Sequence, residues 1–290
     1  MALIYNATFD SQTRILSLLD KAGNVISSCE VPSKSKELTL TATADNSSVK
    51  LTKKGTLSNT YEVNTGDGWT AYAFGTDILL NAGESCKWRC SAHPTTQSDS
   101  NYVQFVMTGK IEASGYITSM LTSGFRSMSS LSGYDYAFSH LFSGCTALTK
   151  AHALRCCETL SPKCFNYTFS GCSSLTLDAL FTVSKTVVLA ESCCLGMYYN
   201  CSGLEIGYAR GRTLKDNCFK LMFAGCTSLS TVITNATTMG SATGAFTDWL
   251  SGVTTKISFD RVVFAYASLG LPTNSFSGIP TNWRRKDATT

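Results

Sequence analysis

Hydrophobic and polar residues alternate in several short runs of the first half of the chain, as they do in half-buried β-strands. The alternation is clearest at residues 38–42, 61–63, 70–74 and 102–107. Clusters of Asn, Asp, Gly and Ser separate these runs and predict turns between them. Short strands at this spacing predict a small β-sandwich-like domain, which we place at residues 37–127.

Two more strand-like runs precede this domain, at residues 14–20 and 25–31. The sequence Asp-Lys-Ala-Gly-Asn at residues 20–24 has the composition of a turn. Residues 1–36 are therefore predicted to form a β-hairpin or meander. So small a sheet is marginal alone, so we expect it to serve in attachment or oligomerisation.

From about residue 128 the pattern becomes a repeat. The motif Phe-x-Gly-Cys-x-x-Leu begins at Phe142, Phe169 and Phe223, and a variant with Tyr and Asn begins at Tyr198. A decayed fifth copy begins at Trp249, and the marker positions 145, 172, 201, 226 and 253 are 27, 29, 25 and 27 residues apart. Such a period predicts a short solenoid of about five stacked units with a C-terminal cap in residues 128–290.

The equivalent positions of the repeat are expected to form the core. We expect the aromatic residues to stack in one buried column and the cysteines in a neighbouring one. The residues of this repeat core are Phe142, Cys145, Leu148, Phe169, Cys172, Leu175, Tyr198, Cys201, Leu204, Phe223, Cys226 and Leu229. Upstream, Cys164 precedes Thr168 and Cys218 precedes Met222 by four residues, a spacing that predicts a short amphipathic turn or helix.

The sequence Met-Phe-Ala-Gly-Cys-Thr-Ser-Leu, which begins at Met222, resembles the repeat unit of the BspA-like leucine-rich-repeat family of bacterial surface proteins. Segments 40–50, 104–111 and 277–283 resemble sequences beside such repeats in proteins of gut Bacteroidales and of their phages, the crAss-like phages. The resemblance covers about residues 37–285 and implies a leucine-rich-repeat fold. The chain departs from the family pattern at His152, Ala153 and Asp178.

Composition narrows the classes of function. Charged residues make up 15% of the chain and the net charge is +4, which is too low and too dispersed for a nucleic-acid partner. The one basic cluster, residues 283–286, is expected to be a solvated tail. No stretch approaches 18 apolar residues, so we expect no membrane insertion. The first residues lack the features of a signal peptide, so synthesis in the cytoplasm is expected.

The chain holds 13 cysteines, which we interpret as reduced core thiols rather than disulfides. Cys86 and Cys90 are expected to be structural, on one face of a strand. In the adjacent pairs Cys156–Cys157 and Cys193–Cys194, one member is expected to point inward and the other outward.

Chemistry-bearing motifs are missing from the sequence. None of His93, His140 and His152 lies in a zinc-binding spacing, and no nucleophile or phosphate-binding motif occurs. We expect no catalytic residue, no cofactor and no metal site. A glycan hydrolase needs a pair of carboxylates, and such a pair can be formed by residues that meet only in the folded chain. This class of enzyme is therefore the alternative.

The function expected from this resemblance is that of a virion structural protein: a phage head-fibre, capsid-decorating or tail-associated protein. Residues 1–36 would bind other virion proteins in a homo-oligomer, and the repeats would face a host surface protein or glycan. The expected location is the virion. A BspA-like adhesin on the bacterial cell surface is the alternative.

Overall fold

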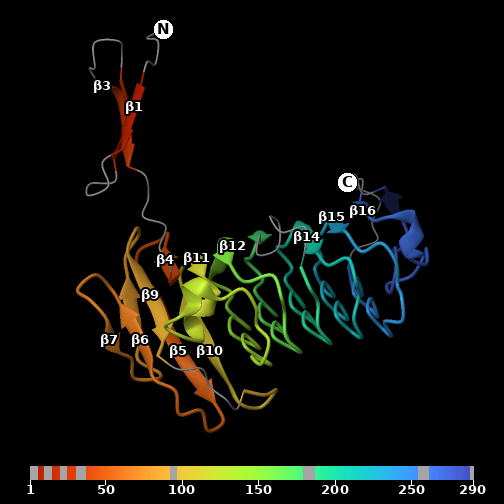
Figure 1. Cartoon of the computed structure of the whole chain (residues 1–290), viewed down its shortest axis with the longest axis horizontal. Helices are drawn as coiled ribbons and strands as arrows, with labels where there is room; N and C mark the ends of the chain where they lie inside the picture. The colour runs from red at the N-terminus through yellow and green to blue at the C-terminus, as the bar shows by residue number, and fades with distance from the viewer. Residues whose placement is uncertain are drawn as a thin grey trace. The chain divides into compact units, whose positions relative to one another are not determined.

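The computed structural model describes the backbone of residues 6–9, 15–19, 25–30, 37–91, 97–178, 187–253 and 261–287 (Figure 1). Side chains are described from residue 37 onward, except at positions 152, 153, 177 and 178. Strands far outnumber helical segments among these residues, which confirms the predicted β-rich class. Their helical segments are three short 3-10 turns: η1 (Ile117–Met120), η2 (Phe125–Ser127) and η3 (Ala267–Leu269).

The chain forms two compact units, Met1–Ser35 and Lys36–Thr290. In the first, β1 (Asn6–Phe9), β2 (Ile15–Leu19) and β3 (Val25–Glu30) form an antiparallel sheet in the order β1-β2-β3. The pairing of β2 with β3 is the hairpin that the sequence predicts. The predicted turn at residues 20–24 lies outside the described residues.

The second unit begins with two β-sheets. In the smaller sheet, β5 (Ser47–Lys54) pairs with β10 (Tyr102–Thr108) and β8 (Ile78–Leu80). The two sheets share a core, in which Trp88 of the larger sheet meets Phe105 of β10 edge to face at 5.1 Å. The larger sheet has the order β13-β12-β11-β4-β9-β6-β7 and consists of β4 (Leu38–Ala42), β6 (Tyr61–Asn64), β7 (Thr70–Ala71), β9 (Ser85–Cys90), β11 (Ile111–Tyr116), β12 (Leu148–Arg155) and β13 (Leu177–Asp178).

Strand β11 connects these sheets to the repeats. It pairs antiparallel with β4 on one side and parallel with β12 on the other. The larger sheet therefore continues across residue 127, where we place a domain boundary. The division into one domain at residues 37–127 and another at residues 128–290 stays a prediction.

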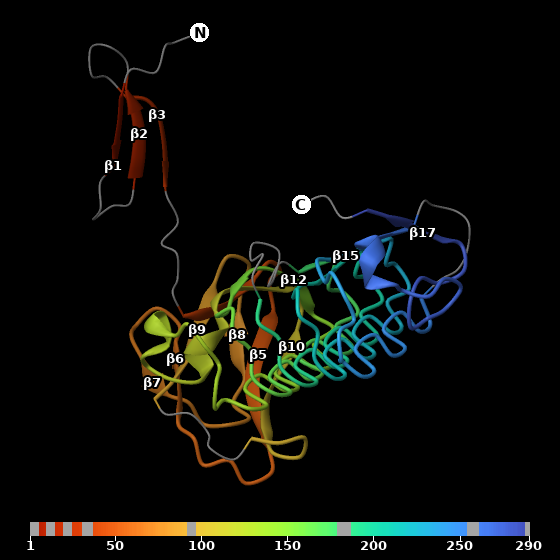
Figure 2. The same ribbon diagram turned by 45° about the vertical axis from the view of Figure 1, so that its right-hand side comes forward.

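Residues beyond β13 contribute a further sheet, in which all strands are parallel (Figure 2). Its strands are β14 (Ile206–Ala209), β15 (Thr231–Thr234), β16 (Arg261–Phe264) and β17 (Trp283–Lys286), in that order. The expectation of a solvated tail at 283–286 is wrong, because the backbone of β17 pairs with β16 and Trp283 is buried. Only the charged side chains at 284–286 stay exposed, and charge alone does not reveal backbone pairing.

Successive turns of the chain stack side by side in the repeat region (Figure 1). Each turn, which we call a coil, contains a run of about a dozen residues whose amides alternate between two kinds of hydrogen bond. The Phe138 and Phe142 amides donate to carbonyls of the next coil, at 2.8 Å each. Between them, the amides of Ser139 and Leu141 donate three residues back within their own coil. Of the turn or helix predicted at residues 164–168 and 218–222, the structure has the turn, since every second amide bonds to a neighbouring coil and no helix can form.

Every fourth residue of these runs has a left-handed backbone conformation. The third such position in each coil is the Gly or Asn of the sequence motif. Gly adopts the left-handed conformation freely and Asn tolerates it, which explains why these two residues occur there. The left-handed residues are Tyr136, His140 and Gly144; Lys163, Tyr167 and Gly171; Ser192, Gly196 and Asn200; Asn217, Leu221 and Gly225; and Gly244, Asp248 and Gly252.

Candidate functional site

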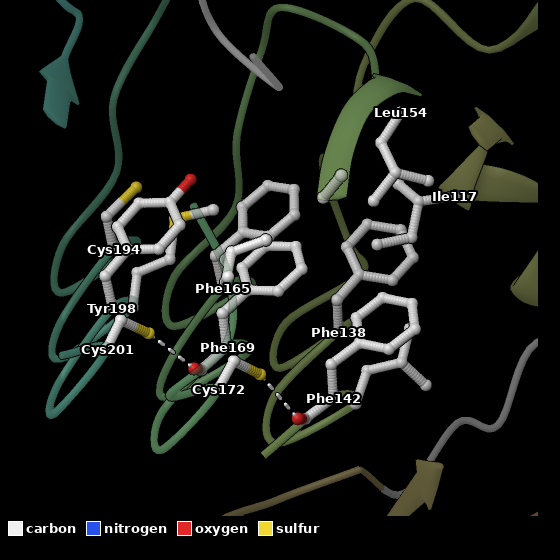
Figure 3. Packing of buried hydrophobic residues seen from close by; sticks show 14 of the residues in the cluster. Ile117, Phe138, Phe142, Leu154, Phe165, Phe169, Cys172, Cys194, Tyr198 and Cys201 are labelled. Carbon is white, nitrogen blue, oxygen red and sulfur yellow. Dashed lines mark hydrogen bonds between the residues drawn. The ribbon is translucent and has the colours of Figure 1, made fainter. Parts of the chain in front are cut away.

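The aromatic residues of the motif form one buried column along the coils (Figure 3). The ring of Phe169 lies 5.3 Å from that of Phe142 and 5.5 Å from that of Tyr198, with interplanar angles of 6° and 4°. Tyr198 stacks on Phe223 at 5.6 Å. The column begins at Phe105 on β10, 5.4 Å from Phe142. The same stack thus passes from the β-sheets into the repeats.

The motif cysteines lie beside this column, and their S–H groups donate hydrogen bonds to backbone carbonyl oxygens. Cys172 Sγ lies 3.1 Å from the carbonyl oxygen of Phe142, and Cys201 Sγ lies 2.9 Å from that of Phe169 (Figure 3). Cys226 donates in the same way to Tyr198. Each thiol hydrogen therefore binds the aromatic residue of the preceding coil. This contact needs the protonated thiol, because a thiolate or disulfide sulfur has no hydrogen to donate.

All twelve predicted core residues are buried. Cys145 donates a hydrogen bond in the same way, to the carbonyl oxygen of Phe105 on β10 at 3.1 Å, which extends the thiol series to the smaller sheet. The motif leucines lie at or just before the strand segments of their coils and complete the interior. They are Leu148, Leu175, Leu204 and Leu229, each at most 1% exposed.

At a second set of interior positions, the type of residue differs more from one coil to the next. The rings of Phe138 and Phe165 lie 5.1 Å apart, and Cys194 follows them in the third coil (Figure 3). Cys193 and Cys194 are both buried, so the expectation that one of them points outward is wrong. They lie in a run of turns rather than in a strand, and adjacent side chains there need not alternate between two faces.

Stability is expected to fall above about pH 9, because the unfolded chain can then ionise thiols that the folded chain keeps protonated. Burial raises the pKa of Cys86 and of Cys218 to about 12, from 9.0. Below pH 9 both states hold the proton; above it only the unfolded state releases it, and each such thiol then costs about 1.4 kcal/mol per pH unit. Urea unfolding with reductant at pH 7.5 and 10 measures the difference. Equal midpoints would contradict the burial of these thiols.

A polar and aromatic surface accompanies the interior columns. The ring of His140 stacks between those of Tyr102 and Tyr167, at 4.5 and 5.6 Å, and Tyr199 meets Tyr167 edge-on at 6.0 Å. Burial lowers the pKa of His140, with Lys54 acting in the same sense and Asp99 against it. The imidazole is therefore neutral near pH 7.

Charged and amide groups adjoin these rings. The carboxylate of Asp99 accepts a hydrogen bond from Asn166 Nδ2 at 2.7 Å and pairs with Lys163 Nζ at 3.4 Å. Lys163 also donates to the hydroxyl of Tyr136 at 2.9 Å. The Oδ1 atom of Asn166 is buried and lacks a hydrogen-bond partner in the described part of the chain. We call the whole set the Tyr-His patch: Asp99, Tyr102, Tyr136, His140, Lys163, Asn166, Tyr167 and Tyr199.

Sequence reasoning considered His140 only as a metal ligand and missed the other members of the patch. A signal was present, since His140 and Tyr167 each stand two residues before the aromatic residue of the motif. Tyr102 carries no such signal, because it belongs to β10 rather than to a repeat.

Later coils carry a depression of 480 Å³ with a different lining. Three successive coils contribute to it, with hydroxyl groups and charges of both signs. A volume in this range accommodates a small polar ligand. Its lining residues are Glu191, Arg212, Thr213, Leu214, Lys215, Asp216, Thr237, Thr238, Met239, Gly240, Ser241 and Ala242.

Two further kinds of site are missing from the described residues. These residues contain no group of three or more His, Cys, Asp or Glu side chains placed to hold a metal ion. They also contain no helix long and apolar enough to cross a membrane. His93 lies outside the described residues, and so does the side chain of His152.

The geometry thus offers two outward features, the Tyr-His patch and the polar depression, on a body built from stacked coils. Neither feature contains a described cluster with the form of a metal centre. Comparison of the chain with models of protein families, with curated proteins and with solved structures finds no match.

Proposed function

We propose that this chain is a virion structural protein of a phage, located in a head fibre, a capsid decoration or the tail. In this proposal residues 128–290 are a leucine-rich-repeat solenoid that displays an adhesive surface toward the host. Support comes from the stacked coils, whose repeated outward positions offer a broad surface of the kind that solenoids use for recognition. The Tyr-His patch and the depression are the features of that surface on which binding would rest.

The observation that carries the proposal is the small separate sheet of β1, β2 and β3. A small sheet needs a covered hydrophobic face to be stable, so a sheet of three such short strands would gain stability from a partner. Among the described strands of this unit, β1 and β3 are the edges, and open edges readily accept a strand from another chain. We infer that this unit binds another virion protein or a second copy of the chain.

Oligomerisation through this unit would also repeat the adhesive surface. Linked copies bind a multivalent target far more tightly than one copy does, even when each contact is weak. A host surface protein or a surface glycan would be such a target. The proposal includes no catalytic activity, no cofactor and no nucleic-acid partner.

Deletion of residues 1–36 is expected to leave a folded body and to abolish its incorporation into phage particles. Circular dichroism of the truncated protein checks the folding, and a quantitative immunoblot of purified particles measures incorporation. Tyr167→Ala in the full chain is the matched control, because it changes the Tyr-His patch and should incorporate normally.

Normal incorporation of the truncated chain would refute the proposed role of residues 1–36. Antibody labelling of the protein on intact, phage-free bacterial cells would instead favour the alternative, a BspA-like cell-surface adhesin.

A further inference from the structure

Two adjacent cysteines lie apart from the thiol series of the motif. Cys156 and Cys157 directly follow β12, and their Sγ atoms are 3.9 Å apart. Both are free thiols. Neither is at the marker position of a repeat, where Cys145 and Cys172 donate to backbone carbonyls. The pair therefore has no role in the contacts that hold the coils together at those positions.

Accessibility separates this pair from the other described cysteines. Cys156 is the one member of the described set that is partly exposed, and Cys157 keeps 9% of its surface in contact with solvent. The second adjacent pair, Cys193 and Cys194, is exposed by 0% and 1%. The first pair thus lies at the edge of the interior, whereas the second is fully covered.

The contact between the two sulfur atoms also divides their chemical roles. A hydrogen bond from Cys156 lowers the pKa of Cys157, while burial and that same contact raise the pKa of Cys156. The thiolate is the form that attacks a disulfide. In the exchange proposed next, we assign the attack to Cys157 and the resolving step to Cys156.

We propose that Cys156 and Cys157, whose sulfur atoms lie 3.9 Å apart at the edge of the interior, form a dithiol that exchanges with low-molecular-weight disulfides, such as oxidised glutathione, and closes reversibly to a disulfide between the two adjacent residues.

The exchange takes two steps and uses the small disulfide as oxidant. First, the Cys157 thiolate attacks one sulfur of the disulfide, forms a mixed disulfide and releases one small thiolate. Next, Cys156 loses its proton and attacks Cys157 Sγ, which forms the internal S–S bond and expels the second small thiolate. The two thiolates take up the two protons. The protein is oxidised by two electrons, and one disulfide becomes two thiols.

The closed form should be easy to reduce. Adjacent Cα atoms are about 3.8 Å apart, whereas bridged cysteines usually have Cα atoms at least about 4.4 Å apart. A strained ring of this kind has a more oxidising potential than a relaxed disulfide and is labile. A chain that passes from a reducing to an oxidising compartment would therefore carry the pair first open and then closed.

Peptide mapping of the full-length protein after treatment with oxidised glutathione tests this proposal. We expect a loss of two hydrogen atoms in the peptide that holds Cys156 and Cys157, and restoration by a mild thiol reductant. Cys156→Ser should stop the reaction at a mixed disulfide on Cys157. Cys194→Ser, in the buried pair, and Cys164→Ser should leave closure unchanged.

Phenylarsine oxide gives a second readout on the unmutated protein, since it binds two thiols that lie close together. We expect one equivalent to bind and to prevent the reaction with oxidised glutathione. A bridge that involves Cys164, a mixed disulfide that never closes, or an unreactive pair in the folded wild-type protein would overturn the proposal.

Discussion

Replacing Phe169 by Ala should lower the free energy of unfolding by about 3–5 kcal/mol, the range for removing a buried aromatic ring that leaves a cavity. The ring is fully buried and stacks on Phe142 and Tyr198 at 5.3 and 5.5 Å. Its loss interrupts the column in the middle, so neither neighbouring coil can close the gap without shifting its backbone. Urea unfolding followed by circular dichroism measures the change.

Phe276→Ala is the matched control, because this ring is 41% exposed. We expect the control to change the free energy of unfolding by less than about 1 kcal/mol. Similar losses for Phe169→Ala and Phe276→Ala would show that the column does not carry the stability assigned to it.

Replacing Gly225 by Ala should destabilise the protein by at least about 2 kcal/mol. Gly225 has φ = +76°, and a Cβ atom there would lie 3.2 Å from the Asn200 Cα, a tight contact with the backbone of the neighbouring coil, and would displace the Asn200 side chain. The substitution therefore combines an unfavourable backbone conformation with a collision between two coils. The shift in the urea midpoint measures the sum.

Gly144→Ala separates the two contributions. Gly144 has φ = +74°, and no atom lies within 4 Å of the position that its Cβ would take. We expect it to show the backbone cost alone, about 1–2 kcal/mol. If both substitutions cost the same, close stacking of the coils at this position is not what requires glycine.

The period of the repeat was enough to predict which residues fill the interior of the coils. Phe, Gly and Cys recur in one phase, and a residue that recurs in phase along a stack has the same neighbours in every unit. The alternation in the first half likewise predicted the strand β4, and the spacing of Cys86 and Cys90 predicted that they share one face of a strand, which is the buried face of β9.

Local sequence could not predict the backbone of the coils. A spacing of four residues fits one helical turn, but it also fits the left-handed residues at 136, 140 and 144. The choice between them depends on the carbonyls of the next coil, which accept every second amide. This information lies about 27 residues away in the sequence.

The outward features were harder to predict than the core. The Tyr-His patch draws Asp99 and Tyr102 from the first half of the chain and Tyr167 from the repeats. No repeat phase links these residues, because the first coil is covered by β10 and β11 rather than by another coil. Only the folded chain brings them together.

Hydrogen bonds join each coil of the repeat region to its neighbours, and this stacking has a mechanical consequence. A force that pulls on the end of the stack must break all bonds of the last interface before it reaches the next one. At the first coil the interface is reinforced by β11, whose strand pairs on both sides, whereas β17 has a paired neighbour on one side, β16. Under load, such a body would peel from its C-terminal end in steps of one coil and would dissipate work at each step.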